Sequence, residues 1–207
     1  MCDIKIVISG GEGEIIEKKS RFIATVRPVN DESEATAFIE EIKKKYWDAR
    51  HNCSAFVIGE HNELTRCSDD GEPSGTAGRP MLEVILGAEV HNVAVVVTRY
   101  FGGVLLGTGG LVRAYQAAVK EGLANAKIAT QKKGKTYGLT MDYNEWGRVQ
   151  SYLAGNSYNI ENTDYSDKVY ARIILPSSEC DAAVKQLVEL TNGKIKMDEI
   201  GECQYLA

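Results

Sequence analysis

Several residue types and patterns are scarce in this 207-residue chain. No apolar run approaches the roughly 20 residues needed to cross a bilayer, and the first residues lack the layout of a signal peptide. Only three histidines are present, and the cysteines are odd in number and form no CxxC pair: Cys2, Cys53, Cys67, Cys180 and Cys203. Such usage is typical of a reduced protein, so we expect a cytoplasmic location.

Excess positive charge is also absent. The net charge is −5. Residues 1–130 hold 15 Lys/Arg against 18 Asp/Glu, and residues 131–207 hold 9 against 11. A dedicated binder of duplex nucleic acid draws its affinity from a broad basic face, which this composition does not favour. This composition does not exclude a local patch of arginines.

The chain also lacks the common nucleotide-binding and catalytic signatures. There is no GxxxxGK[ST] sequence, and the stretch from Gly107 to Val112 lacks the third glycine of a dinucleotide fingerprint. His51 and Cys53 are too few ligands for zinc, and neither they nor Cys67 complete a nucleophile–base set. We therefore predict no catalytic residue, no metal and no cofactor.

Two glycine-rich stretches are the most distinctive positive feature. The first reads DDGEPSGTAG over residues 69–78, and the second spans residues 102–110. Each is followed by a predicted helix, whose free N–H groups and dipole suit an anion. Arg79, Arg99 and Arg113 lie in or beside these stretches, and a guanidinium suits bidentate contact with phosphate.

We therefore predict one binding surface made from both stretches and their neighbours. Its residues are Asp69, Asp70, Gly71, Glu72, Ser74, Gly75, Thr76, Gly78, Arg79, Arg99, Tyr100, Gly102, Gly103, Gly107, Gly109, Gly110 and Arg113. In the structural alternative, the glycines only form tight turns and the arginines pair with nearby carboxylates. The aromatic residues beside the arginines, including Phe101, either stack on unpaired bases or pack in the core.

Hydrophobic periodicity predicts an α+β protein. Strands are expected at 4–8, 14–18, 21–29, 53–58, 64–68 and 91–100, with residues 10–13 as the turn joining the first two. A helix follows Asp31, which forms a capping-box pattern with Glu34. A second helix has Pro80 as its first residue, and a third opens at Gly109 or Gly110.

A polar, basic, turn-prone segment near residues 131–135 marks a predicted domain boundary. We therefore divide the chain into domains 1–130 and 131–207. The second has a β-α-β-β-α-β order, which is the ferredoxin-like arrangement. Its strands are expected at 136–142, from 158, at 168–175 and within 194–205. Its helices are expected at 144–155 and after Pro176, the latter capped by Ser177.

The two glycine-rich motifs, with the segment Lys18-Lys19-Ser20-Arg21-Phe22-Ile23-Ala24, resemble the signature of the IMPACT family in its bacterial YigZ type. The resemblance covers nearly the whole chain. It implies two two-layer α/β domains, the first similar to domain IV of elongation factor G and the second similar to domain V. A shared fold is only a weak warrant for a shared function.

What the resemblance implies about function is a non-catalytic regulator of translation. Its partners would be RNA, the ribosome or a translation-associated protein, contacted through the first domain. The alternative from the residues is a small-molecule enzyme that holds a phosphate or carboxylate in the same loops, with Asp70 or Glu72 as acid or base. A third possibility places function on the exposed sheet of the second domain. The sequence does not fix the oligomeric state.

Overall fold

The computed structural model describes residues 3–206 and divides into two compact units. The first unit is Ile4–Thr130, and the second comprises residues 131–206 together with Asp3. Cys2 lies outside the described residues. The segment predicted as a turn-prone connector is instead part of strand β8 (Lys127–Met141). Its polar residues take part in a sheet because β10 and β11 pair with it on both sides, and ladder hydrogen bonding outweighs residue propensity there.

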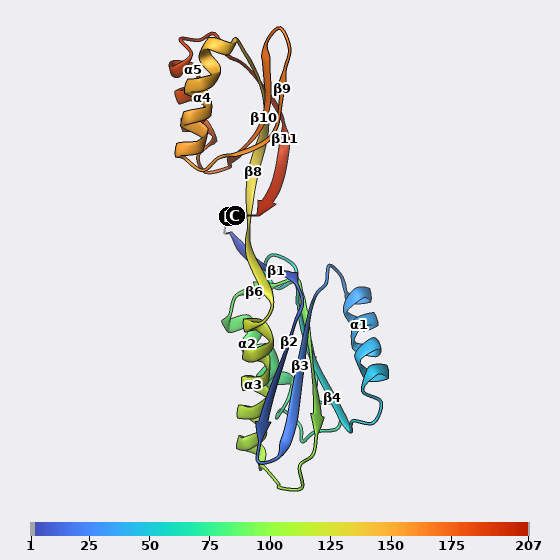
Figure 1. Ribbon diagram of the computed structural model, residues 1–207. Helices are drawn as coiled ribbons and strands as arrows, with labels where there is room; N and C mark the ends of the chain where they lie inside the picture. The colour runs from blue at the N-terminus through green and yellow to red at the C-terminus, as the bar shows by residue number, and fades with distance from the viewer. Residues whose placement is uncertain (1–2, 207) are drawn as a thin grey trace. The chain divides into compact units, whose positions relative to one another are not determined.

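The first unit contains a five-stranded antiparallel sheet in the order β2-β3-β7-β4-β5. Its elements are β1 (Ile4–Ser9), β2 (Gly11–Glu17), β3 (Ser20–Pro28), α1 (Glu32–Lys45), β4 (His51–Ile58), β5 (Leu64–Ser68), α2 (Gly78–Gly87), β6 (Val90–His91), β7 (Val93–Tyr100) and α3 (Thr108–Ala124). Figure 1 shows the helices placed on the two faces of this sheet. Asp31 caps α1 through its side chain, as predicted.

The predicted hairpin between the first two strands is wrong. β1 pairs in parallel with β6, and β2 begins at Gly11 within the other sheet. Gly11 and Gly13 do not form a turn. Their lack of a side chain instead allows α3 and the residues that follow it to pack closely on β2. A Cβ on Gly11 would lie 2.5 Å from the backbone of Ala126, and one on Gly13 would lie 2.6 Å from that of Gly122. Pro80 is likewise the third residue of α2, not its first.

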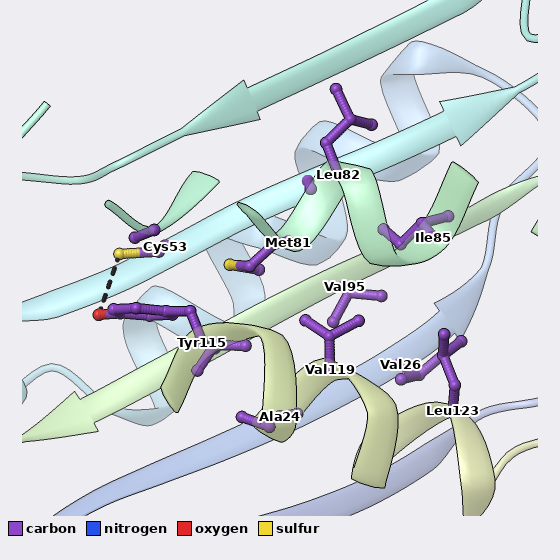
Figure 2. Close-up of a cluster of buried hydrophobic side chains, with 14 of the residues drawn as sticks. Ala24, Val26, Cys53, Met81, Leu82, Ile85, Val95, Tyr115, Val119 and Leu123 are labelled. Carbon is purple, nitrogen blue, oxygen red and sulfur yellow. Dashed lines mark hydrogen bonds between the residues drawn. The ribbon is translucent and has the colours of Figure 1, made fainter. Parts of the chain in front are cut away.

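The core of the first unit follows the period-two alternation of its strands. On one face of the sheet, Val95 and its neighbours pack against α2 and α3, as Figure 2 shows for Met81, Ile85, Val119 and Leu123. On the other face a smaller cluster packs against α1: Val29, Ala35, Phe38, Ile42, Phe56, Ala94 and Val96. The central strands β4 and β7 are therefore buried on both sides.

The second unit has the β-α-β-β-α-β order predicted from the sequence. Its remaining elements are α4 (Tyr143–Gly155), β9 (Asn159–Tyr165), β10 (Val169–Pro176), α5 (Cys180–Leu190) and β11 (Lys196–Leu206). The antiparallel strand order is β11-β8-β10-β9. Leu139, Val149, Ile173 and Leu187 are central to its core. Helix α5 begins after Glu179 without a side-chain cap, so the predicted cap at Ser177 is wrong.

The chain is thus an α+β protein with two mixed layered units. Among residues 3–206, no helix combines the length and the apolar character that crossing a membrane requires. The same residues include no grouping of three or more His, Cys, Asp or Glu side chains arranged to hold a metal ion.

Candidate functional site

Both glycine-rich stretches leave the same end of the first sheet. Strand register places Arg99 beside His51, Tyr100 beside Arg21, and Ser54 beside Ser68. We call this the loop end; it comprises the β2–β3 turn (18–19), the α1–β4 connection (46–50), the first glycine loop (69–77) and the second glycine loop (101–107). Figure 1 shows the β2–β3 turn and the β7–α3 connection together at the lower end of this unit.

The first glycine loop is folded around the Asp69 carboxylate. Asp69 Oδ1 accepts hydrogen bonds from the amides of Ala77 and Gly78 at 3.0 and 2.8 Å, and Oδ2 accepts one from Gly75 at 2.8 Å. Burial acts to raise the pKa of Asp69, but the three amide donors outweigh it and hold that pKa below its ordinary value. The first amides of α2 are therefore already occupied by an internal anion.

The remaining polar groups of the first loop are also largely engaged. Asp70 accepts from the amide of Asn52 at 2.7 Å and pairs with Lys43 at 3.3 Å. The Thr76 hydroxyl donates to the carbonyl of Pro73 at 2.6 Å. Gly78 packs so closely on the β5 backbone that a Cβ would lie 2.7 Å from Ser68. Gly71 and Gly75 supply positive φ, whereas Ser74 is exposed.

Glu72 joins this loop to a buried polar network. Its Oε1 accepts from Arg99 Nη1 at 2.6 Å and from the Tyr115 hydroxyl at 2.9 Å. Cys53 Sγ lies 3.3 Å from the Tyr115 hydroxyl, drawn in Figure 2, and donates to the carbonyl of Asp69. Burial raises the pKa of Cys53 to about 12 and also raises that of Tyr115. A thiol with that pKa is a poor nucleophile at neutral pH.

The second glycine loop is open. Phe101 is 52% exposed and Leu105 is 84% exposed. Gly103 and Gly107 have φ of +85° and +71°, which favour glycine. The N-cap of α3 is Gly107, which has no side chain to accept a hydrogen bond, so within residues 3–206 Gly109 and Gly110 retain uncapped backbone donors. Gly102 instead packs on the β2–β3 turn and donates to Ser20 Oγ at 3.1 Å.

The three predicted arginines have different environments. Arg99 is 7% exposed and forms an ion pair with Glu72, as the structural alternative expected. Arg79 is exposed and lies 3.2 Å from Glu83, one helical turn along α2. Arg113 is exposed and forms no ion pair with any residue in the described range 3–206. Arg113 is thus the one of the three arginines with no carboxylate partner among the described residues.

Other exposed residues at the loop end were not predicted as site residues. Lys18, Lys19 and Arg50 are exposed and form no ion pair within the part of the chain that the structure describes. Trp47 is 82% exposed. The sequence offered no pattern for Arg50 or Trp47, because neither lies in a motif and only the tertiary fold brings them to the glycine loops.

The two lysines occupy an unfavourable turn. Lys18 and Lys19 have φ of 45° and 68° and form the two-residue connection between paired residues Glu17 and Ser20. Both central residues of such a type I′ turn need positive φ, for which Asn-Gly is preferred. Left-handed backbone costs a residue other than glycine about 1 kcal/mol or more. The turn therefore stores backbone strain that an Asn-Gly pair would not carry.

A pocket of about 560 Å³ opens at the loop end. Its walls come from the α1–β4 connection, the ends of β4 and β7, and the second glycine loop: Asp48, Arg50, His51, Arg99, Tyr100, Phe101 and Leu105. The hydroxyl of Tyr100 donates to Asp48 at 2.8 Å. The pocket therefore combines aromatic walls with guanidinium groups.

Comparison with known proteins places this arrangement in a family. The model of the Impact N-terminal domain matches residues 18–123, and a domain of unknown function, DUF1949, matches residues 139–194. The chain is 43% identical to the IMPACT family member YvyE of Bacillus subtilis, covering 97% of this chain and 92% of that protein. It is 37% identical to the IMPACT family member YigZ of Escherichia coli, covering 89% and 92%.

Other comparisons agree with this assignment. A solved structure titled as a hypothetical protein is similar with a TM-score of 0.62 and 34% identity, covering 95% of this chain and 97% of that chain. Protein IMPACT-B of Xenopus tropicalis is 31% identical over 62% of this chain but only 42% of that protein. The fold therefore defines a class of α+β proteins with two units and this loop end. The chain belongs to the IMPACT family.

Proposed function

We propose that this protein is a non-catalytic binding protein that contacts single-stranded RNA through the loop end and acts in translation. The observation that carries the proposal is the grouping of unpaired cations with exposed aromatic side chains. Lys18, Lys19, Arg50 and Arg113 supply the cations, and Trp47 and Phe101 supply exposed rings. Five of the six come from connections at one end of one sheet. Arg113 lies in the second turn of α3, and its guanidinium reaches back to Gly109 at the start of that helix.

The electrostatic argument is local, since the whole chain is acidic. Asp69, Asp70 and Glu72 of the first loop are occupied by internal amides or cations. The charges of Asp70 and Glu72 are thereby offset, whereas Lys18, Lys19, Arg50 and Arg113 have no carboxylate partner among the described residues. Phosphate contacts by such side chains release counterions and make binding depend steeply on salt.

The aromatic rings favour a single strand over a duplex. Unpaired bases stack on exposed aromatic side chains, and each such stack contributes about 1–3 kcal/mol. Bases in an A-form helix are not available for this contact. The glycines of the second loop have no side chain and so also allow the backbone to approach a strand closely.

A role in translation is supported by the family to which the chain belongs, for which the resemblance described above implies ribosome- or RNA-linked regulation. The match to Protein IMPACT-B covers only 42% of that protein, so partners of its remaining part carry no argument here. We propose RNA, alone or within the ribosome, as the partner of the loop end.

The test is equilibrium binding of a fluorescently labelled ten-nucleotide oligouridylate at several salt concentrations. We expect the logarithm of affinity to fall linearly with the logarithm of salt concentration. Arg113→Ala should reduce the slope by about 0.7, the value for one phosphate contact on a single strand. Arg66→Ala, which removes an exposed arginine paired with Glu32, is the matched control and should keep the slope. Absence of binding at low salt would overturn the proposal.

A further inference from the structure

We propose that the pocket between the α1–β4 connection and the second glycine loop holds a single nucleotide of the bound RNA strand. In this arrangement the base lies against Phe101, and the phosphate is held by Arg50 and Arg99. The inference rests on the proposed function and deepens it, because it names which part of the loop end recognises a nucleotide.

Arg99 is the first support for this site. Its Nη1 is bonded to Glu72, while its Nε is buried and has no hydrogen-bond partner within residues 3–206. A guanidinium carries five N–H donors, and buried donors in native proteins are nearly always satisfied. Arg99 also lines the pocket. The Nε itself has almost no exposed surface, so a phosphate there would contact the edge of a guanidinium that Glu72 already fixes in position.

Arg50 supplies the net positive charge that the Arg99–Glu72 ion pair does not. The Arg99–Glu72 pair is neutral as a unit, so it orients an anion without adding net attraction. Arg50 lines the same pocket and is exposed, with no ion pair to any described residue. Asp48 on the same wall carries a negative charge, which disfavours a di- or triphosphate. The pocket charge therefore suits one phosphate diester or monoester.

The apolar walls match a base. Phe101, Tyr100 and Leu105 border the pocket, and the Phe101 ring lies 5.7 Å from the Arg99 guanidinium. The guanidinium lies over one face of the ring, so a base would stack on the opposite face of Phe101 and direct its phosphate past the ring edge to Arg50 and Arg99. A volume of about 560 Å³ is within the usual range for sites that hold small organic groups.

The experiment uses the full chain and two pocket variants, Phe101→Ala and Arg50→Ala. The probe is the labelled ten-nucleotide oligouridylate, with unlabelled UMP and ATP as competitors. Loss of one stacked base predicts at least a fivefold weakening for Phe101→Ala. We expect a similar loss for Arg50→Ala together with a smaller salt slope. Ile16→Ala and Arg66→Ala remove exposed side chains of the same unit outside the pocket and should bind within twofold of the unmodified protein.

A second readout locates the base directly. Photocrosslinking with 5-iodouridine in the same oligonucleotide, followed by peptide mass spectrometry, should place the adduct within residues 100–105. Thermal melting of each variant checks that the fold is retained, which we expect because Phe101 and Arg50 are exposed.

The outcomes separate the inference from the proposed function. Binding that is unaffected in both pocket variants would overturn the nucleotide pocket and leave RNA binding by the loop end standing. No binding of the oligonucleotide by any variant would overturn both. Pocket-dependent binding of UMP or ATP without binding of RNA would show a free nucleotide as the occupant and contradict the inference.

Discussion

The two glycine-rich loops leave the same end of one sheet, yet their polar groups have different partners. In the first loop, Asp69 occupies the amides of α2, and Glu72 is buried against Arg99 and Tyr115. In the second loop, Phe101 and Leu105 are exposed, and the first amides of α3 have no side-chain partner among the described residues. The carboxylates of the first loop have internal hydrogen-bond partners. The second loop leaves backbone N–H donors and an aromatic ring available to a ligand.

The comparison shows that glycine content alone does not identify a binding loop. Glycine provides positive φ or close approach in both loops. What separates them is whether the helix amides and nearby charges already have internal partners. The first loop therefore determines how the loop end is held together, and the second is the better candidate for contact with a ligand.

The largest expected effect concerns the buried pair of the first loop. Glu72→Ala leaves Arg99 buried without its carboxylate, which should lower the free energy of unfolding by about 3–5 kcal/mol. Glu83→Ala breaks the exposed pair with Arg79 and should cost no more than about 1 kcal/mol. Urea denaturation measures both. Equal, small effects would contradict a structural role for the first loop.

A smaller effect is expected at Asp69, with a defined pH dependence. Asp69→Asn loses part of the amide-bonded carboxylate and should cost about 1–3 kcal/mol at pH 7. Because folding lowers the pKa of Asp69 from 3.8, the stabilisation is fully present above that value and is lost as pH falls through the folded pKa. Urea melts from pH 7 to pH 3 should show the difference between the two proteins narrowing below about pH 4. Ser74→Ala, an exposed residue of the same loop, should change little.

The smallest effect on stability, and one of opposite sign, is expected at the β2–β3 turn. Replacing Lys18 with Asn and Lys19 with Gly should stabilise the protein by about 1 kcal/mol, because both suit positive φ. The same change should weaken RNA binding. The Lys18→Ala/Lys19→Ala variant should weaken binding without the gain in stability. Unchanged binding in both variants would show that the strained lysines do not contact RNA.

Much of the fold follows from local patterns in the sequence. The strands predicted at 53–58 and 91–100, the helix capped by Asp31 and the helix opening at Gly109 or Gly110 each correspond to an element that the structure contains. The errors concern long-range pairing. Gly11 and Gly13 were interpreted as a turn because their packing against α3 is invisible in the local sequence.

The candidate site was predictable only in part. The motifs predicted that both loops belong to the site but did not determine whether Arg99 is free or paired. The structure shows that Arg99 forms an ion pair with Glu72. Trp47 and Arg50 could not be predicted, because they follow an ordinary helix and reach the loop end only through the antiparallel register of β4 and β7. The use of each predicted site residue in binding stays a prediction.

The most direct test of RNA binding by the loop end compares salt dependence between variants. Affinity for the ten-nucleotide oligouridylate is measured across salt concentrations for the unmodified protein, Lys18→Ala/Lys19→Ala, and the control Arg66→Ala. The account predicts that the lysine variant loses about 1.4 from the slope, since each phosphate contact on a single strand contributes about 0.7, while Arg66→Ala, whose arginine is paired with Glu32, keeps the original slope. Identical slopes for all three proteins would contradict it.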